Sequence, residues 1–438
     1  MSLVAGSFFW VIRGLLALSE HLVLRKPIKK WAAAAALLAG ALYLALSGCE
    51  VPAQRSYLML AIMFAAVLVG RPALSLRNVA LAAIVAMVLD PAAVLQPGLQ
   101  MSFLAVTGLL SFFEARRMEQ SSQPTLRRGR VIHAVMRLAL AFLTLAVTTI
   151  IAGICTGPPA AYHFGRVSPY SLVGNLLALP VVSSIIMPMA LAGTVLTLVG
   201  FEHLPFAIMH MGLRCLMAIS DWTASLPGAR YFVPGQTAIS AVVFSAGILH
   251  VCLVRSAARW LGTVIFAVGF VLAMFTPRPD VLVERTGRNV AIRNGADELV
   301  AANPRRSRFA VERWLIADGD DASPSESAAR QGWQCADHVC LAVVKDKRIA
   351  FAQAEAEGKL TCPKADILVA SFPLRKSCSS IPLRIDRFDV WRMGAYALFI
   401  NGSTIRTETA RSVRGARPWV IEPRARKIRT QSRSAAAQ

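Results

Sequence analysis

Residues Leu89–Arg117 read LDPAAVLQPGLQMSFLAVTGLLSFFEARR and show the pattern that organises the first two thirds of the chain. One apolar run ends at Asp90, the helix-breaking pair Pro97-Gly98 follows, and a second apolar run starts at Gln100. Proline lacks the amide proton that a helix needs, and glycine loses the most backbone entropy on folding. The stretch therefore predicts a helix, a broken turn and a second helix.

This turn supplies candidates for a polar path through a membrane. An acid at membrane depth marks a functional site by default, although an ordinary turn outside the membrane is the commoner setting for an Asp-Pro pair such as that at Asp90. An amide in hydrocarbon needs partners, so Gln100 and Ser102 are expected to face the protein interior or a wet path, with Asp90 at its outer mouth. The other candidates for the path are Gly98, Asn175, Arg55 and Arg166.

The composition indicates a membrane protein. Of the 438 residues, 55% are hydrophobic and 16% are charged, with a mean hydropathy of +0.52, whereas soluble proteins are about 25% charged. The formal net charge is +22. The excess of positive loops on the cytoplasmic side of membrane proteins explains much of this charge, and a polyanionic partner is the alternative explanation.

The apolar runs predict a mainly α fold, a polytopic membrane bundle with broken helices over 1–276 and a small soluble α/β domain over 279–410. Residues 411–438 are a basic tail that we expect to be disordered. Between ordinary spans, three segments are less regular. We expect a broken segment at Thr156–Ser168, a kinked helix pair or re-entrant hairpin at Pro169–Gly200, and an amphipathic helix at Glu202–Pro227 that lies in the interface plane or closes a pore.

The loops alternate in charge along the chain. Basic loops follow the first, third and fifth apolar runs, and the loops after the second and fourth carry few positive charges. The distribution predicts that the loop Arg116–Arg130 is cytoplasmic and that the soluble C-terminal domain is extracytoplasmic.

Short strands are predicted in that C-terminal domain. Asp280–Arg293 alternates in polarity around a polar turn, as a hairpin does. Further strands are expected at Arg313–Asp318, Val339–Asp346, Arg348–Ala352 and Ala365–Ser371.

Cysteine spacing favours disulfides over metal in this domain. An even set in an extracytoplasmic domain fits two disulfide bonds, and it consists of Cys335, Cys340, Cys362 and Cys378. Zinc would prefer tighter CxxC pairs, and only His338 lies nearby. A reduced and buried set of thiols is the alternative.

No enzymatic signature accompanies these features. The sequence contains no GxSxG, HExxH, HxHxDH or Walker A motif, and its seven histidines are dispersed. We therefore expect no catalytic residues, no metal site and no cofactor.

Several segments, in order, resemble the competence region of ComEC-type DNA-uptake channels. They are Val4–Ala33, Ser47–Arg71, Leu89–Leu110 and Asn175–Ser183. The resemblance extends to about Phe275, and Gly98, Gln100 and Ser102 match the most recognisable motif of the family. It implies a multi-pass protein of the bacterial inner membrane that passes single-stranded DNA across the bilayer during natural transformation. The implied partners are the DNA strand, DNA-receptor proteins, cytoplasmic DNA-processing proteins and further copies of the chain.

Two departures from the family keep other interpretations open. The usual N-terminal OB-like domain is not found before the first apolar run, which suggests a truncated, non-functional fragment as one alternative. Many members carry a metallo-β-lactamase-like domain whose HxHxDH ligands are absent here, so no metal-dependent nuclease is expected. A small-solute transporter is a further alternative, which the lack of a visible inverted repeat disfavours.

Overall fold

The computed structural model describes residues 2–119, 130–336, 338–353, 362, 364–374, 378–415 and 417. The chain forms two compact units, Met1–Thr276 and Pro277–Gln438. Most of the predicted cytoplasmic loop Arg116–Arg130 and most of the tail 411–438 lie outside the described residues.

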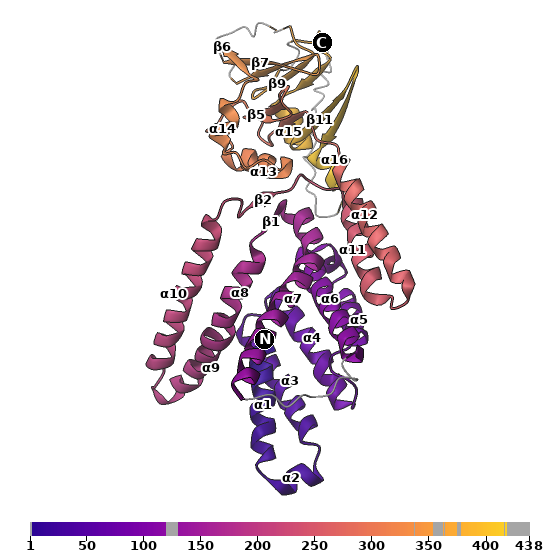
Figure 1. The fold of residues 1–438 in the computed structure, drawn as a ribbon. Coiled ribbons are helices and arrows are strands. Elements are labelled where there is room, and N and C mark those ends of the chain that lie inside the picture. The colour runs from indigo at the N-terminus through magenta and orange to yellow at the C-terminus, as the bar shows by residue number, and fades with distance from the viewer. Residues whose placement is uncertain are drawn as a thin grey trace, which may run out of the picture. The chain divides into compact units, whose positions relative to one another are not determined.

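The first unit is built from helices (Figure 1). In chain order they are α1 (Ser2–Ala17), α2 (Glu20–Arg25), α3 (Ile28–Leu46), α4 (Val51–Leu68), α5 (Leu76–Leu89), η1 (Pro91–Leu95), α6 (Pro97–Glu119), α7 (Arg130–Phe164), α8 (Ser171–Val181), η3 (Val182–Ile186), α9 (Met187–Leu196), η4 (Thr197–Val199), α10 (His203–Ser225), α11 (Ala238–Leu253), η5 (Ala257–Trp260) and α12 (Leu261–Met274). By length and composition, six described segments could cross a membrane: 28–46, 51–68, 97–116, 139–164, 171–199 and 257–274. The predicted multi-pass helical fold is confirmed.

Small residues let these helices approach closely. Ala33 and Ala36 of α3 are fully buried against α1 and α4, where Leu60 and Phe64 complete the contact. Because lipid is as apolar as the side chains, van der Waals contact between close backbones replaces the hydrophobic effect as the main attraction. The alanine-rich sequence of α3 therefore places it between two neighbours.

Two predicted interruptions differ from the structure. Helix α7 continues through Pro158 and Pro159 to Phe164, so the expected break at Thr156–Ser168 begins only after that residue. Pro169–Gly200, expected as a kinked helix pair or a re-entrant hairpin, is helical from Ser171 to Val199, and the π-helical turn η3 joins α8 to α9 just after Pro180 and Val181, so the hairpin alternative is wrong. A π-turn or a neighbouring group can accommodate a proline within a membrane helix, so proline alone does not end one.

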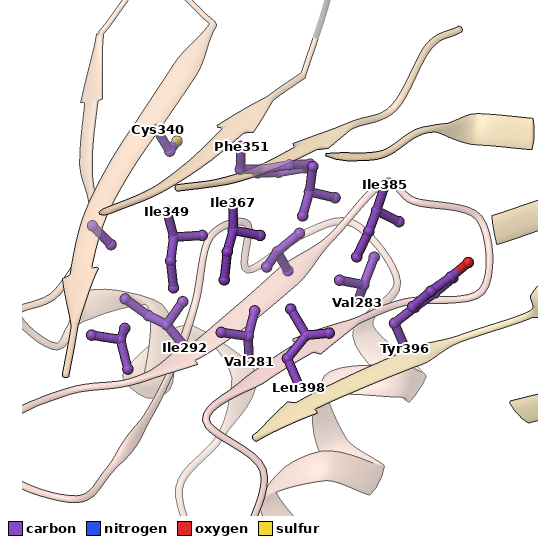
Figure 2. Close-up of a cluster of buried hydrophobic side chains, with 14 of the residues drawn as sticks. Val281, Val283, Ile292, Cys340, Ile349, Phe351, Ile367, Ile385, Tyr396 and Leu398 are labelled. Atoms are coloured by element: carbon purple, nitrogen blue, oxygen red, sulfur yellow. The ribbon is translucent and has the colours of Figure 1, made fainter. Parts of the chain in front are cut away.

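The second unit contains two five-stranded sheets. One has the order β10 (Leu383–Ile385), β9 (Ile367–Ala370), β8 (Lys347–Ala352), β7 (Val339–Val344), β6 (Gln334–Ala336), and the other β12 (Thr404–Thr409), β11 (Tyr396–Asn401), β3 (Val281–Val283), β4 (Val290–Arg293), β5 (Leu299–Ala301). The second sheet is antiparallel throughout, while β8, β9 and β10 are parallel neighbours. Side chains from both sheets meet in one core, where Val281, Ile349 and Leu398 are fully buried (Figure 2).

The helices of this unit are α13 (Arg308–Asp318), α14 (Pro324–Ala329), α15 (Arg387–Met393) and α16 (Ala410–Arg414). The strand predicted at Arg313–Asp318 is wrong, because these residues belong to α13. Val311 and Leu315 lie one turn apart on α13 and pack with Leu299 of β5. A short apolar run fits a strand or a helix equally well, and here its contact with the sheet decides.

Candidate functional site

Asp90 stabilises the turn between α5 and α6. Its carboxylate accepts a hydrogen bond from the Ala92 amide at 3.0 Å and another from the Gln96 side chain at 3.3 Å. The first of these bonds caps the short helix η1. Asp90 is exposed, and these local contacts make it a capping residue of the broken turn.

Gly98 lies directly against Arg55. A Cβ atom added at Gly98 would lie 2.8 Å from the guanidinium carbon of Arg55, closer than real side chains approach. Arg55 belongs to the first turns of α4 and is half-buried. The absence of a side chain at Gly98 therefore lets a cation of α4 contact the start of α6.

Gln100 joins three elements. Its amide nitrogen donates to the Val94 carbonyl of η1 at 2.8 Å, and its amide oxygen lies 2.9 Å from His163 Nε2 on α7. An amide oxygen only accepts, so His163 carries its proton on Nε2 in this arrangement. Ser102, two residues further along α6, is half-buried. We call Arg55, Asp90, Gly98, Gln100 and His163 the turn cluster.

A groove of about 680 Å³ opens beside the same end of α7. One wall is a face of α7, another comes from the first turn of α8 and the last turns of α10, and a two-stranded ribbon borders it. The ribbon pairs β1 (Arg166–Val167) with β2 (Tyr231–Phe232) and so joins two loops that are far apart in sequence. We call this cavity the α7 groove.

Two arginines and an asparagine give the α7 groove its polar end. Arg166, Asn175 and Arg230 all line it, and all three are exposed. Within the described part of the chain, neither guanidinium group pairs with a carboxylate. Their charge is thus available to an anion. Phe164 and Tyr170 line the same end of the groove.

A second, shallow cavity, of about 490 Å³, lies further along α7 and is lined by Leu140, Ala141, Thr144, Leu145 and Thr148. These residues and the α7 residues of the first groove fall in two rows with four-residue spacing, and such rows wind around the helix instead of staying on one side of it. Along the helix axis, residues 140–164 span about 36 Å, close to the thickness of a bilayer.

Most of the α7 residues that line the two cavities are small and weakly polar. Thr148 and Thr156 donate their hydroxyl protons to carbonyls of their own helix, at 2.9 and 2.8 Å. Between them lie Ala152 and Gly153. The hydroxyl oxygens retain acceptor capacity, and the α7 residues that line the two cavities carry no charge, although Leu140, Leu145 and Phe164 among them are bulky.

The structure thus divides the predicted path residues into two groups. Arg55, Gly98 and Gln100 meet in the turn cluster, and Arg166 and Asn175 meet in the α7 groove. The sequence alone did not indicate Arg230 or the two rows of α7 residues that line the cavities. Four-residue spacing along 140–164 could have indicated the rows, whereas no local signal pairs the loop of Arg166 with that of Arg230.

In the second unit the four predicted cysteines lie in two bonded pairs. Cys335 is bonded to Cys340 across β6 and β7, and Cys362 is bonded to Cys378. Over the residues that the structure describes, no group of three or more His, Cys, Asp or Glu side chains could hold a metal ion.

Comparison with known proteins agrees with the membrane unit. The family model described as "Competence protein" matches residues 1–258, more than half of the chain. The chain is also similar to the competence protein ComA of Neisseria gonorrhoeae, with 28% identity over 287 residues, which are 65% of this chain and 36% of that protein. The aligned region thus spans about a third of that relative. No solved structure matches the chain. The chain belongs to the competence protein family.

Proposed function

We propose that this chain forms the inner-membrane channel through which one strand of DNA enters the cell during natural transformation. The observation that carries the proposal is the α7 groove, where Arg166 and Arg230 pair with no carboxylate among the described residues, together with the second cavity beside α7. A polyanion needs cations where it enters and a path free of bulky side chains through the bilayer.

The chemistry of the groove suits a single strand. Arginine binds phosphate through charge-assisted hydrogen bonds, and aromatic faces such as those of Phe164 and Tyr170 stack on bases of any sequence. The threonine and glycine residues in the two rows of α7 would then line part of the strand's route across the bilayer. Nothing in this arrangement needs base recognition, which fits uptake of DNA irrespective of sequence.

The proposal includes the location and the partners of the chain. The C-terminal unit lies on the extracytoplasmic side, where DNA-receptor proteins deliver the strand, and DNA-processing proteins receive it in the cytoplasm. The channel contains no catalytic residue and binds no cofactor. Further copies of the chain complete the assembly in the bilayer.

Complementation of a competence-deficient deletion strain tests the proposal. The chain should restore transformation, and a variant with Arg166→Gln and Arg230→Gln should lose about tenfold or more, because a hydrogen bond to a charged group contributes about 1.5–3 kcal/mol. Arg71→Gln, in the exposed loop between α4 and α5, is the matched control. A chain that restores no uptake, or equal uptake by the double variant and the control at equal membrane levels, contradicts the proposal.

A further inference from the structure

One buried asparagine of the C-terminal unit fastens the loop that precedes α13. Asn289 lies in the turn between β3 and β4 and is 0% exposed. Its side-chain nitrogen donates to the carbonyl oxygens of Asn303 and Arg306, at 2.7 and 2.8 Å. Its side-chain oxygen accepts from the amides of Val290 and Asn303, at 3.0 and 3.1 Å. An amide side chain offers two donors and two acceptor positions, so Asn289 uses all of them to hold the loop against the hairpin.

The loop is also braced from within. The side-chain oxygen of Asn303 accepts from the backbone amides of Arg305 and Arg306, at 3.0 and 3.1 Å. Ser307 follows in the left-handed conformation, with φ 53°, and α13 begins at the next residue. Because these bonds hold the backbone in one shape, the side chains of the loop start from defined positions, which lowers the ordering cost of binding a ligand.

Exposed arginines gather around this loop. They are Arg288, which directly precedes Asn289, together with Arg305, Arg306, Arg308 and Arg313. Within the part of the chain that the structure describes, only Arg308 among them pairs with a carboxylate, that of Glu312 at 3.0 Å. Like charges that lie close together repel one another in the free protein, and a polyanion would relieve this repulsion. We call these five arginines and Phe309 the arginine platform.

An aromatic ring stands among these arginines. Phe309, the second residue of α13, is 76% exposed. Arg313 lies one turn further along the same face of the helix, whereas Val311 and Leu315 pack with β5 on the opposite face. Guanidinium groups bind phosphate oxygens through charge-assisted hydrogen bonds, and an exposed ring provides a face on which a base can stack.

Building on the proposed function, we propose that the arginine platform binds single-stranded DNA, with the arginines on its phosphates and Phe309 stacked on a base. All residues of the platform belong to the C-terminal unit, so this site is separate from the α7 groove. The C-terminal unit thereby acquires a DNA-holding function of its own.

The composition of the platform favours a nucleic acid over an anionic membrane surface. A helix that docks on lipid buries a continuous apolar face. Phe309 is the one large apolar side chain that α13 exposes, and it lies beside Arg308, Glu312 and Arg313. On a membrane, this ring would supply all of the apolar burial, and Glu312 would meet the like charge of the headgroups. A base stacked on the ring leaves every one of these charges in water.

Binding of a fluorescent oligothymidylate to the purified full-length chain tests the inference. Arg305→Gln combined with Arg306→Gln should weaken binding about tenfold or more. The slope of log K against log salt concentration should become shallower by about 1.4, since each phosphate contact of a single strand contributes about 0.7. Arg348→Gln combined with Arg387→Gln removes the same charge from exposed positions elsewhere in the unit and is the matched control. Both double variants are also measured with Arg166→Gln and Arg230→Gln, so that binding in the α7 groove does not mask the platform.

Phe309→Ala separates stacking from charge. It should weaken binding about fivefold or more and leave the salt slope unchanged, because a ring releases no counterions. Equal affinities of the Arg305/Arg306 variant and its control, as expected if the platform binds lipid headgroups instead, would overturn the inference. An unchanged affinity of Phe309→Ala would overturn the assignment to a single strand. Failure of the wild-type chain to restore transformation would instead refute the proposed function, which the binding measurement does not test.

Discussion

At the scale of single residues, one buried ion pair in the C-terminal unit connects β4 to α13. The guanidinium group of Arg293 donates to both carboxylate oxygens of Asp318, at 2.5 and 3.1 Å, and the two side chains are 6% and 7% exposed. Asp297 also contacts Arg293, at 3.4 Å, but it is 70% exposed. A buried pair adds little net stability, whereas the loss of one partner leaves an uncompensated charge.

We therefore expect Asp318→Asn to destabilise the protein by about 3–5 kcal/mol. The matched variant Asp297→Asn removes a carboxylate from the same arginine but should cost less than about 1 kcal/mol, because water screens an exposed pair. Thermal unfolding of the purified full-length chain measures both. Equal effects of the two variants would show that the burial of Asp318 does not matter.

Gln100 is the residue where the turn cluster meets α7. Replacement by leucine removes its bonds to Val94 and His163 and leaves the histidine without its acceptor, so we expect lower DNA uptake at an unchanged protein level. Thr107→Val, at a buried position two turns along α6, should have little effect. The measurement is transformation frequency normalised to the amount of protein in the membrane. Equal losses for the Gln100 and Thr107 variants would show that the turn serves packing only.

At the scale of elements, glycines determine how closely α11 and α12 approach. A Cβ atom added at Gly247 of α11 would lie 2.7 Å from the Phe266 amide nitrogen and 2.8 Å from the Gly262 carbonyl oxygen of α12. An atom added at Gly269 would lie 2.9 Å from the Phe244 amide nitrogen. Both sites press against backbone, which cannot rotate away as a side chain can.

Gly247→Leu should consequently separate the two helices and destabilise the membrane unit. Overpacking a tight contact costs about 1–3 kcal/mol, and a backbone neighbour places the cost toward the upper end. Gly14→Leu in α1, where no atom lies within 4 Å of an added Cβ, is the control. The detergent-solubilised proteins are compared by thermal unfolding, and equal stability of the two variants would contradict the close contact.

At the scale of the whole molecule, the charge of the loops predicts a topology. The ion pair between Glu114 near the end of α6 and Arg255 after α11 joins the ends of two helices that run in the same direction through this scheme. Reporter fusions at Gln123 and Ala354 should then give opposite signals, cytoplasmic for the first and extracytoplasmic for the second. Two cytoplasmic signals would reject the scheme.

The same topology predicts an oxidised C-terminal unit. Cys335–Cys340 and Cys362–Cys378 should appear as bonded peptides in mass spectrometry under non-reducing conditions, since disulfides persist outside the cytoplasm. Their reduction should lower the unfolding temperature, because removing a native disulfide from a small exported domain costs about 2–5 kcal/mol. Four freely alkylated thiols would count against both the bonds and the location.

Local patterns in the sequence determined the membrane-helical class, the turn after Leu89, the hairpin over Asp280–Arg293 and the family. Apolar runs, proline and glycine act on their own neighbourhood, and so their effects can be predicted without long-range contacts. Tertiary structure alone decided that Arg313–Asp318 is helical and that Arg166 and Arg230 share one groove. The groove exists because helices far apart in sequence pack together, and a single sequence contains no direct record of that packing.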